Sequence, residues 1–245
     1  MSEPATLEII SDRVLEDEVI FPPGDILSDE PPFESDLHRD QIDLLIRILK
    51  LWWRERQDFY ASGNLTIYYS PNQKKSENFR GLDFFVVLAP QKKDRKSWVV
   101  WQEDGKYPNL IVEILSSSTA AVDKGLKKQV YQDTFSTPDY FWFDPSTMEL
   151  QGFHLVDGKY QEIQLTTDGR LWSQQLELYL GVYEGKLRFF TTENQLILSS
   201  EELAEQERLR AEQAEERVQQ AEERAQQAEQ EIARLRRFCV YRAST

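Results

Sequence analysis

The chain has 245 residues, of which 40% are apolar and 12% aromatic, so it can bury a sizeable core in one domain or in a domain with an appendage. Its net charge of −14 excludes a generally basic surface, so any contact with a polyanion must use a local patch or a metal ion. The single cysteine, Cys239, excludes an intrachain disulfide, and the sequence shows neither an export signal nor a run long enough for a bilayer. We therefore expect a cytoplasmic protein without a membrane partner.

The first 33 residues are acidic and rich in proline, which predicts an extended arm. From Ser35 onward, apolar residues recur in steps of three and four, which predicts an amphipathic helix that continues to about Tyr60. Ser62 and Gly63 are expected to end this helix, and residues 65–70 are expected to form a short strand.

Two almost wholly apolar strands follow, and each contains one acid. Residues 82–89 read LDFFVVLA with Asp83 near the start, and residues 110–115 read LIVEIL with Glu113 in the middle. Strands without a polar face are typical of the centre of an α/β sheet that is covered on both sides. A lone buried carboxylate costs several kcal/mol unless it is paired, protonated or bound to a metal. Asp83 and Glu113 therefore indicate a candidate site.

A helix is predicted after the second acidic strand, with Ser118 and Thr119 as N-cap candidates. It is expected to reach about Phe135 and to turn an apolar stripe toward the sheet: Val122, Leu126 and Val130. The apolar run at residues 140–144 then predicts a crossover between parallel strands. From residue 149 to 190, short strands and Asp-Gly turns predict antiparallel hairpins.

The two acids and this helix could together form a metal site. Neighbouring carboxylates, completed by water and a substrate phosphate, suit Mg²⁺, which takes hard oxygen ligands. The helix carries Lys124, Lys127 and Lys128, and a lysine at such a site could orient a water or stabilise charge. This chemistry is hydrolysis of a phosphodiester. Two simpler interpretations stay open: Asp83 as a strand-edge acid bonded to a loop, and Glu113 as a buried ion-pair partner, for example of Lys127.

Four segments resemble, in order and spacing, the motifs of the Uma2 family in the PD-(D/E)XK nuclease superfamily: LDFFVV, IVEILSSST, DKGLKKQVYQ and TPDYFWFDP. The resemblance covers roughly residues 34–190. It implies an α/β fold, with a restriction-endonuclease-like mixed sheet and flanking helices, that cleaves DNA with Mg²⁺ or Mn²⁺. It also implies that Asp83 and Glu113 are catalytic metal ligands and that Lys127 is the catalytic lysine.

The sequence departs from the superfamily pattern at two positions. Leu82 stands where a proline would precede the first acid, and Leu115 stands where the superfamily lysine would follow Glu113 by two residues. The resemblance therefore requires that Lys127 reach the site from the helix. Four accessory candidates lie near these motifs: Glu34, His38, Asp123 and Tyr131.

The C-terminal part is predicted as a separate helix over residues 199–237, after a nuclease-like domain at 34–192 and before a short tail at 238–245. Its mostly alanine apolar residues recur in heptads from Ala211 onward. In a parallel coiled coil, arginines at g would face glutamates at e: Arg210, Arg217 and Arg224 opposite Glu215, Glu222 and Glu229. This pattern predicts a homo-oligomer. Because an alanine seam buries little area, a solitary solvated helix is the alternative.

Three function classes therefore remain after the sequence alone. The chain could be a metal-dependent endonuclease, a catalytically inactive nuclease fold that binds nucleic acid or protein, or an assembly protein that acts through its coiled coil.

Overall fold

The computed structural model describes residues 36–72, 78–90, 93–116 and 123–243, and the predicted arm over residues 1–33 lies outside this part. The first half contains α1 (Asp36–Trp52), β1 (Phe59–Tyr68), β2 (Phe79–Leu88), β3 (Trp98–Val99), the 3₁₀ turn η1 (Val100–Gln102) and β4 (Leu110–Ile114). The second half contains the π-helix η2 (Asp123–Lys127), α3 (Lys128–Asp133), β5 (Asp139–Asp144), β6 (Glu149–Val156), β7 (Lys159–Glu162), β8 (Arg170–Ser173), β9 (Leu178–Tyr183), β10 (Lys186–Phe190) and α4 (Ser200–Ala243).

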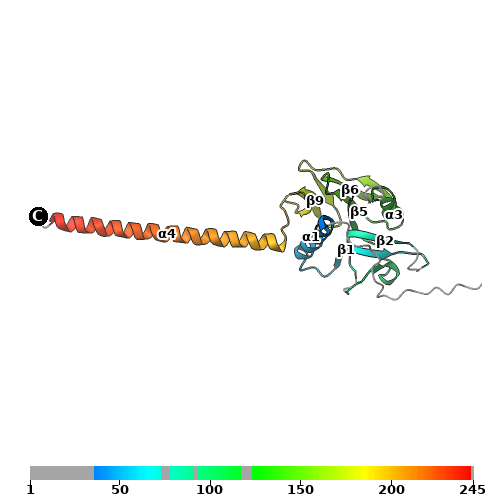
Figure 1. The fold of residues 1–245 in the computed structure, drawn as a ribbon, viewed down its shortest axis with the longest axis horizontal. Helices are drawn as coiled ribbons and strands as arrows, with labels where there is room; N and C mark the ends of the chain where they lie inside the picture. Colours follow the sequence, from blue (N-terminus) through cyan, green and yellow to red (C-terminus); the bar gives the residue numbers. More distant parts are fainter. Residues whose placement is uncertain (1–35, 73–77, 91–92, 117–122, 244–245) are drawn as a thin grey trace, which may run out of the picture.

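The main sheet is mixed and has the strand order β3-β1-β2-β4-β5-β6-β7. Strands β4 and β5 run parallel, so the chain between them, which includes η2 and α3, is the predicted crossover. A second, antiparallel sheet has the order β10-β9-β8. The predicted class, a mixed α/β sheet with flanking helices and a long C-terminal helix, is confirmed (Figure 1).

Two apolar clusters cover the two faces of the main sheet. Alternate residues of β4 and β5 enter different clusters, which identifies the clusters as opposite faces. One cluster joins the sheet to α1 and to the small sheet, and it includes Ile42, Leu45 and Leu180. The other joins the sheet to α3 through Tyr131, and to Phe135 just beyond the end of α3. The central strands β2, β4 and β5 are therefore covered on both sides, as their apolar sequences predicted.

The first helix ends earlier than predicted, at Trp52 instead of about Tyr60. The aromatic residues beyond it do not continue the helix: Trp53 packs edge-on against Phe59, with ring centroids 5.0 Å apart, and β1 begins there. Gly63, predicted as a terminator, lies inside β1. A Cβ at this position would lie 2.2 Å from the carbonyl oxygen of Asp83 and 2.4 Å from Ile42 Cγ2. Glycine is needed here because two chain segments approach closely.

The apolar stripe predicted for the crossover helix is wrong at Leu126, whose exposed fraction is 57%. The described part of this helix begins as the π-helix η2, which has a wider turn than an α-helix and so changes which residues face the sheet. Tyr131 is fully buried in place of Leu126, and Val130 packs only partly. Ser118, Thr119 and Val122 lie outside the described residues.

Helix α4 leaves the domain and projects away from it, with its C-terminal end farthest from the sheets (Figure 1). It continues past residue 237, where the predicted helix ended, to Ala243. At the described side chains from Leu203 to Ala233, every residue is exposed.

None of the helices in the described ranges is both long and apolar enough to cross a membrane.

Candidate active site

Glu113 is fully buried near the end of β4, and two groups from the crossover helix bind its carboxylate. Lys127 Nζ donates to Oε2 over 3.1 Å, and the Tyr131 hydroxyl donates to Oε1 over 2.5 Å. Lys127 and Tyr131 are four residues apart, which places both on one side of the helix. The cost of burying this carboxylate is therefore offset by a cation and a phenol.

Lys127 reaches the site from the helix, as the resemblance required. Its side chain is 18% exposed, so the ammonium lies at the edge of the buried region. Leu115, at the usual position of the superfamily lysine, is buried in the apolar cluster on the α3 side of the sheet. The ion pair foreseen as the simpler interpretation of Glu113 is thus present, and it uses the same lysine.

Asp83 lies where the pairing of β1 with β2 is interrupted. The bridged pairs Gly63–Phe84 and Leu65–Leu82 flank a position at which Asn64 has a left-handed φ of 46°. Residues two apart in a strand normally share a face, yet Ala61 packs beneath α1 while Leu65 packs on the opposite face. The strand therefore changes faces beside Asp83.

This interruption lets the Asp83 carboxylate point toward β4. The last bridged pair between β2 and β4 is Phe84 with Val112, and one further step would set Asp83 opposite Glu113. Instead of a backbone group, Asp83 Oδ2 accepts from the Ile114 N–H over 2.8 Å. The structure thus brings the two predicted carboxylates to adjacent positions on neighbouring strands.

His38, an accessory candidate, holds the other oxygen of Asp83. Its Nε2 lies 3.1 Å from Asp83 Oδ1, and both side chains are largely buried. The helical pattern contained the signal for this contact, because His38 precedes the buried Gln41, Ile42 and Leu45 by three, four and seven residues. Glu34 and the Asp123 side chain lie outside what the structure describes.

The surroundings of Asp83 favour its ionised form. Burial alone would raise the pKa of Asp83, but the hydrogen bond and charge of His38, the charge of Lys127 and the Ile114 N–H together hold this pKa below its ordinary value of 3.8. Lys127 therefore acts on both carboxylates: it binds Glu113 directly and stabilises the charge of Asp83.

The other lysines of this helix lie over aromatic rings. Lys124 Nζ is 3.9 Å from the ring centre of Trp142 and pairs with Glu149 over 3.4 Å. Lys128 Nζ is 3.4 Å from the ring centre of Phe153, and its partial burial lowers the pKa of its ammonium. Lys124 is exposed, whereas Lys128 is half-buried.

The donors at this site fit a hard divalent cation. In the described part of the chain, no three or more His, Cys, Asp or Glu side chains gather as a complete metal cage. Mg²⁺ does not need one, because it is held by one or two carboxylates together with water and phosphate oxygens. Asp83 and Glu113 supply two such carboxylates.

A second buried carboxylate was not predicted from the sequence. Asp139, fully buried at the start of β5, accepts from His154 Nδ1 over 2.7 Å, from Ser173 Oγ over 2.6 Å and from the Gln175 N–H over 3.0 Å. His154, which lacked a ligand-like spacing in the sequence, lies here. The aspartate sits between the histidine and the serine, so the histidine cannot take the serine proton. This group joins the two sheets and does not form a nucleophilic triad.

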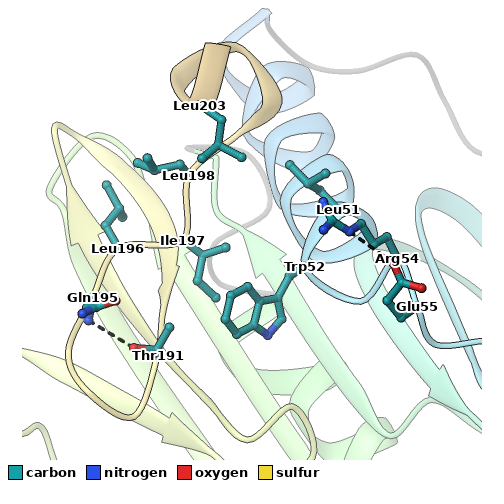
Figure 2. Close-up of a pocket in the computed structure, with 10 residues that line it drawn as sticks. All are labelled: Leu51, Trp52, Arg54, Glu55, Thr191, Gln195, Leu196, Ile197, Leu198 and Leu203. Atoms are coloured by element: carbon teal, nitrogen blue, oxygen red, sulfur yellow. Dashed lines mark hydrogen bonds and ion pairs between the residues drawn. The ribbon is translucent and has the colours of Figure 1, made fainter. Parts of the chain in front are cut away.

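A hollow of about 440 Å³ lies elsewhere, between the end of α1, residues 191–198 and the first turn of α4 (Figure 2). Leu51, Trp52 and Leu203 line it, and its charged groups, Arg54 and Glu55, pair with each other. It contains none of the predicted catalytic residues, so we do not assign the chemistry to it.

Comparison with known proteins gives a family and one structural likeness. A family model, Uma2, described as "Putative restriction endonuclease", matches residues 16–189. No curated protein matches the chain. Among solved structures, the chain is similar to the crystal structure of a "putative nuclease belonging to DUF820" from Anabaena variabilis, with 12% sequence identity and a TM-score of 0.44 over 60% of this chain and 76% of that one.

Proposed function

The chain belongs to the Uma2 family, and from this premise we propose that it is a Mg²⁺- or Mn²⁺-dependent endonuclease that hydrolyses phosphodiester bonds of DNA. One observation carries the proposal: Lys127 binds Glu113, and Asp83 accepts a hydrogen bond from Ile114, the residue that follows Glu113 in β4. Asp83 and Glu113 would hold the cation.

Each residue of the site has a separate task in this proposal. The bound cation would polarise a phosphoryl oxygen and lower the pKa of a water. Lys127 would orient the attacking water or stabilise the charge that develops on the phosphate. Tyr131 holds one oxygen of Glu113, and His38 with the Ile114 N–H holds Asp83. These contacts restrict both carboxylates before any substrate binds.

The charge of the chain limits how DNA could bind. With a net charge of −14, the surface as a whole repels a polyanion. Lys124, Lys127 and Lys128 lie close together on the crossover helix, and they would contribute local positive charge together with the cation. We therefore propose weak affinity for DNA in the absence of the metal. We also propose a cytoplasmic location, supported by the single cysteine, and a homo-oligomeric state.

One observation favours a second candidate, a nuclease fold that binds without turnover. Both oxygens of Glu113 already have protein donors, Lys127 and Tyr131, so a cation must compete for this carboxylate. Titration of Mn²⁺ by calorimetry separates the two candidates. Binding that is lost in the Asp83→Asn variant supports the enzyme, and no uptake by the unmodified protein supports the binding module.

Activity itself is tested with the Glu113→Gln variant, which keeps the size of the side chain and removes its charge. We expect cleavage of supercoiled plasmid with Mg²⁺ or Mn²⁺ to be lost, while the circular dichroism spectrum stays unchanged. Glu149→Gln is the matched control, because Glu149 also pairs with a lysine of the crossover helix but is exposed. Cleavage that persists in Glu113→Gln would refute the assignment.

A further inference from the structure

Helix α4 contains charged residues that have no oppositely charged neighbour three or four residues away. In an α-helix, side chains meet at spacings of three and four residues. The four such neighbours of Arg217 and of Arg224 are all uncharged: Gln213, Ala214, Gln220 and Ala221 for the first, and Gln220, Ala221, Gln227 and Ala228 for the second. Neither arginine therefore has an acidic partner at the spacings that favour an ion pair along a helix.

The acids at the complementary positions share this property. Glu215, Glu222 and Glu229 have no lysine or arginine three or four residues away on either side. The base of the helix differs: Arg208 pairs with Glu205 over 2.6 Å and with Glu212 over 2.9 Å. A solitary charged helix depends on many such pairs. Over residues 213–230 of α4, the sequence places no lysine or arginine three or four residues from Glu215, Glu222 or Glu229.

We propose that α4 pairs in parallel and in register with α4 of a second copy of this chain. In that arrangement Arg210, Arg217 and Arg224 of one copy face Glu215, Glu222 and Glu229 of the other, and the symmetry of the pair repeats each contact. An antiparallel pair would set arginine against arginine and glutamate against glutamate, so charge selects the parallel one.

The apolar seam agrees with this pairing. Val218 and Ile232 are 58% and 51% exposed, and both belong to the heptad series that starts at Ala211. The other seam positions in the described side chains beyond Ala211 are alanines, which allow the two helix backbones to approach closely. Because the alanine layers bury little area, the pair should dissociate measurably on dilution.

The base of α4 is fixed to the domain, so the pairing also positions the domains. Ser199 and Glu202 cap the helix reciprocally: Ser199 N–H donates to Glu202 Oε2 over 2.7 Å, and Glu202 N–H donates to Ser199 Oγ over 3.2 Å. The nearly buried Arg188 donates to both oxygens of Glu202, over 2.8 and 2.6 Å. Arg47 of α1 pairs with Glu201 over 2.7 Å.

A parallel pair therefore holds two domains at the same end of the coiled coil, so that two candidate sites can act on one DNA molecule. This consequence rests on the proposed nuclease function, whereas the pairing itself does not. The test below measures mass and cross-linking without DNA or metal, so the pairing can fail or succeed independently of the nuclease assignment.

The test exchanges the charges on the full-length chain. One variant carries Arg210→Glu, Arg217→Glu and Arg224→Glu, and a second carries Glu215→Arg, Glu222→Arg and Glu229→Arg. By sedimentation equilibrium, we expect the unmodified protein to form dimers, each variant alone to dissociate at least about tenfold more readily, and an equal mixture of the two to recover dimers. The matched control is Glu216→Arg with Glu223→Arg, because these residues lie outside the seam and its flanks; it should dimerise normally.

Cys239 reports the direction of pairing, because it is the single cysteine and lies near one end of α4. Mild oxidation of a parallel dimer should give a covalent dimer on a non-reducing gel, whereas the ends of an antiparallel pair are roughly 60 Å apart and cannot be linked. A monomer at about 100 μM, or a mixture of variants that stays monomeric while circular dichroism shows intact helix, would overturn the proposal. A dimer that does not cross-link would overturn its parallel direction.

Discussion

Two fully buried carboxylates on the paired strands β4 and β5 have very different surroundings. Asp139, at the start of β5, is bound by a histidine, a serine hydroxyl and a backbone N–H that come from the neighbouring strand and the second sheet. Glu113, near the end of β4, is bound by a lysine and a tyrosine of the crossover helix. Asp139 thus has three donors on its two oxygens. Glu113 differs in having a second carboxylate, Asp83, on the neighbouring strand.

This difference shows that burial alone does not distinguish a candidate metal ligand from a structural acid. Both side chains have no exposed surface, so exposure would rank them equally. The two acids differ in their neighbouring groups. Glu113 has a partly exposed lysine and a second carboxylate beside it. Metal-assisted hydrolysis of a phosphodiester uses groups of these two kinds. The donors around Asp139 instead connect one sheet to the other, which is a structural task.

The largest effect should come from removing Asp139. Asp139→Ala leaves three donors without their acceptor, and one of them, Ser173, is fully buried, so we expect the free energy of unfolding to fall by about 3–5 kcal/mol. Urea denaturation followed by tryptophan fluorescence measures it. Asp139→Asn, which keeps one acceptor oxygen, should lose less. A cost of Asp139→Ala below about 1 kcal/mol would contradict a structural role for this group.

Removing the lysine should break the other cluster without unfolding the protein. In Lys127→Gln the amine that serves Glu113 and Asp83 is gone, and we expect the rate of DNA cleavage at saturating Mg²⁺ to fall about 10²- to 10³-fold. Lys128→Gln is the control, because Lys128 lies over the ring of Phe153 and does not bind Asp83 or Glu113. Equal losses in the two variants would mean that the lysines act only by attracting DNA.

A smaller effect is expected from the histidine that holds Asp83. His38→Ala removes the contact to Oδ1 but leaves the bond from the Ile114 N–H. We expect Mn²⁺ to bind about 10- to 100-fold more weakly, because groups that orient a metal ligand typically contribute this much. Calorimetry measures the affinity. His154→Ala, at the other cluster, should leave Mn²⁺ affinity unchanged, and a similar loss there would remove the contrast between the clusters.

The smallest expected effect is a change in folding stability at low pH. The folded-state pKa of Asp83 lies below its ordinary value of 3.8, because the bonds and charges around it outweigh burial. Its ionised form therefore adds stability that is complete above about pH 5 and is lost as the pH falls below about 4. The difference in unfolding free energy between the unmodified protein and Asp83→Asn should be constant near neutral pH and shrink toward pH 3. If this difference in unfolding free energy grew as the pH fell, the pKa of Asp83 would be raised on folding, which would contradict the prediction.

The sequence predicted the elements of the fold best where the pattern is local and strong. The apolar runs gave β2, β4 and β5, and the parallel crossover followed from a helix between two buried strands. The end of α1 was wrong because Trp53 continues the helical spacing by following Leu49 by four residues, yet its ring packs against Phe59, where β1 begins. The face of the crossover helix was wrong at Leu126 because a π-turn changes the phase of the pattern, and no residue type signals such a turn.

The candidate site was predicted in its parts but not in its arrangement. Asp83 and Glu113 stood out as single acids in apolar strands, and the family resemblance singled out Lys127. The structure places Lys127 on Glu113 and Asp83 on the neighbouring Ile114 N–H. The interruption at Asn64 that turns Asp83 toward β4 could not be predicted, because it depends on pairing between two strands. Asp139 was overlooked at the edge of an aromatic strand: its partners His154 and Ser173 lie 15 and 34 residues further on, and one sequence gives no sign that they meet.

One contact between distant parts of the chain bears on the order of events during synthesis. The side-chain amide of Gln41 exchanges two hydrogen bonds with the backbone of Leu187, at 2.9 and 3.0 Å, across 146 residues of sequence. Helix α1, which carries His38, is thus not locked onto the domain until β10 has been made. Helix α4 follows β10 in the chain and is therefore synthesised after it. The ribosome therefore releases the strands of the domain before α4, so each domain can begin to fold before the proposed pairing of its α4 with a second copy.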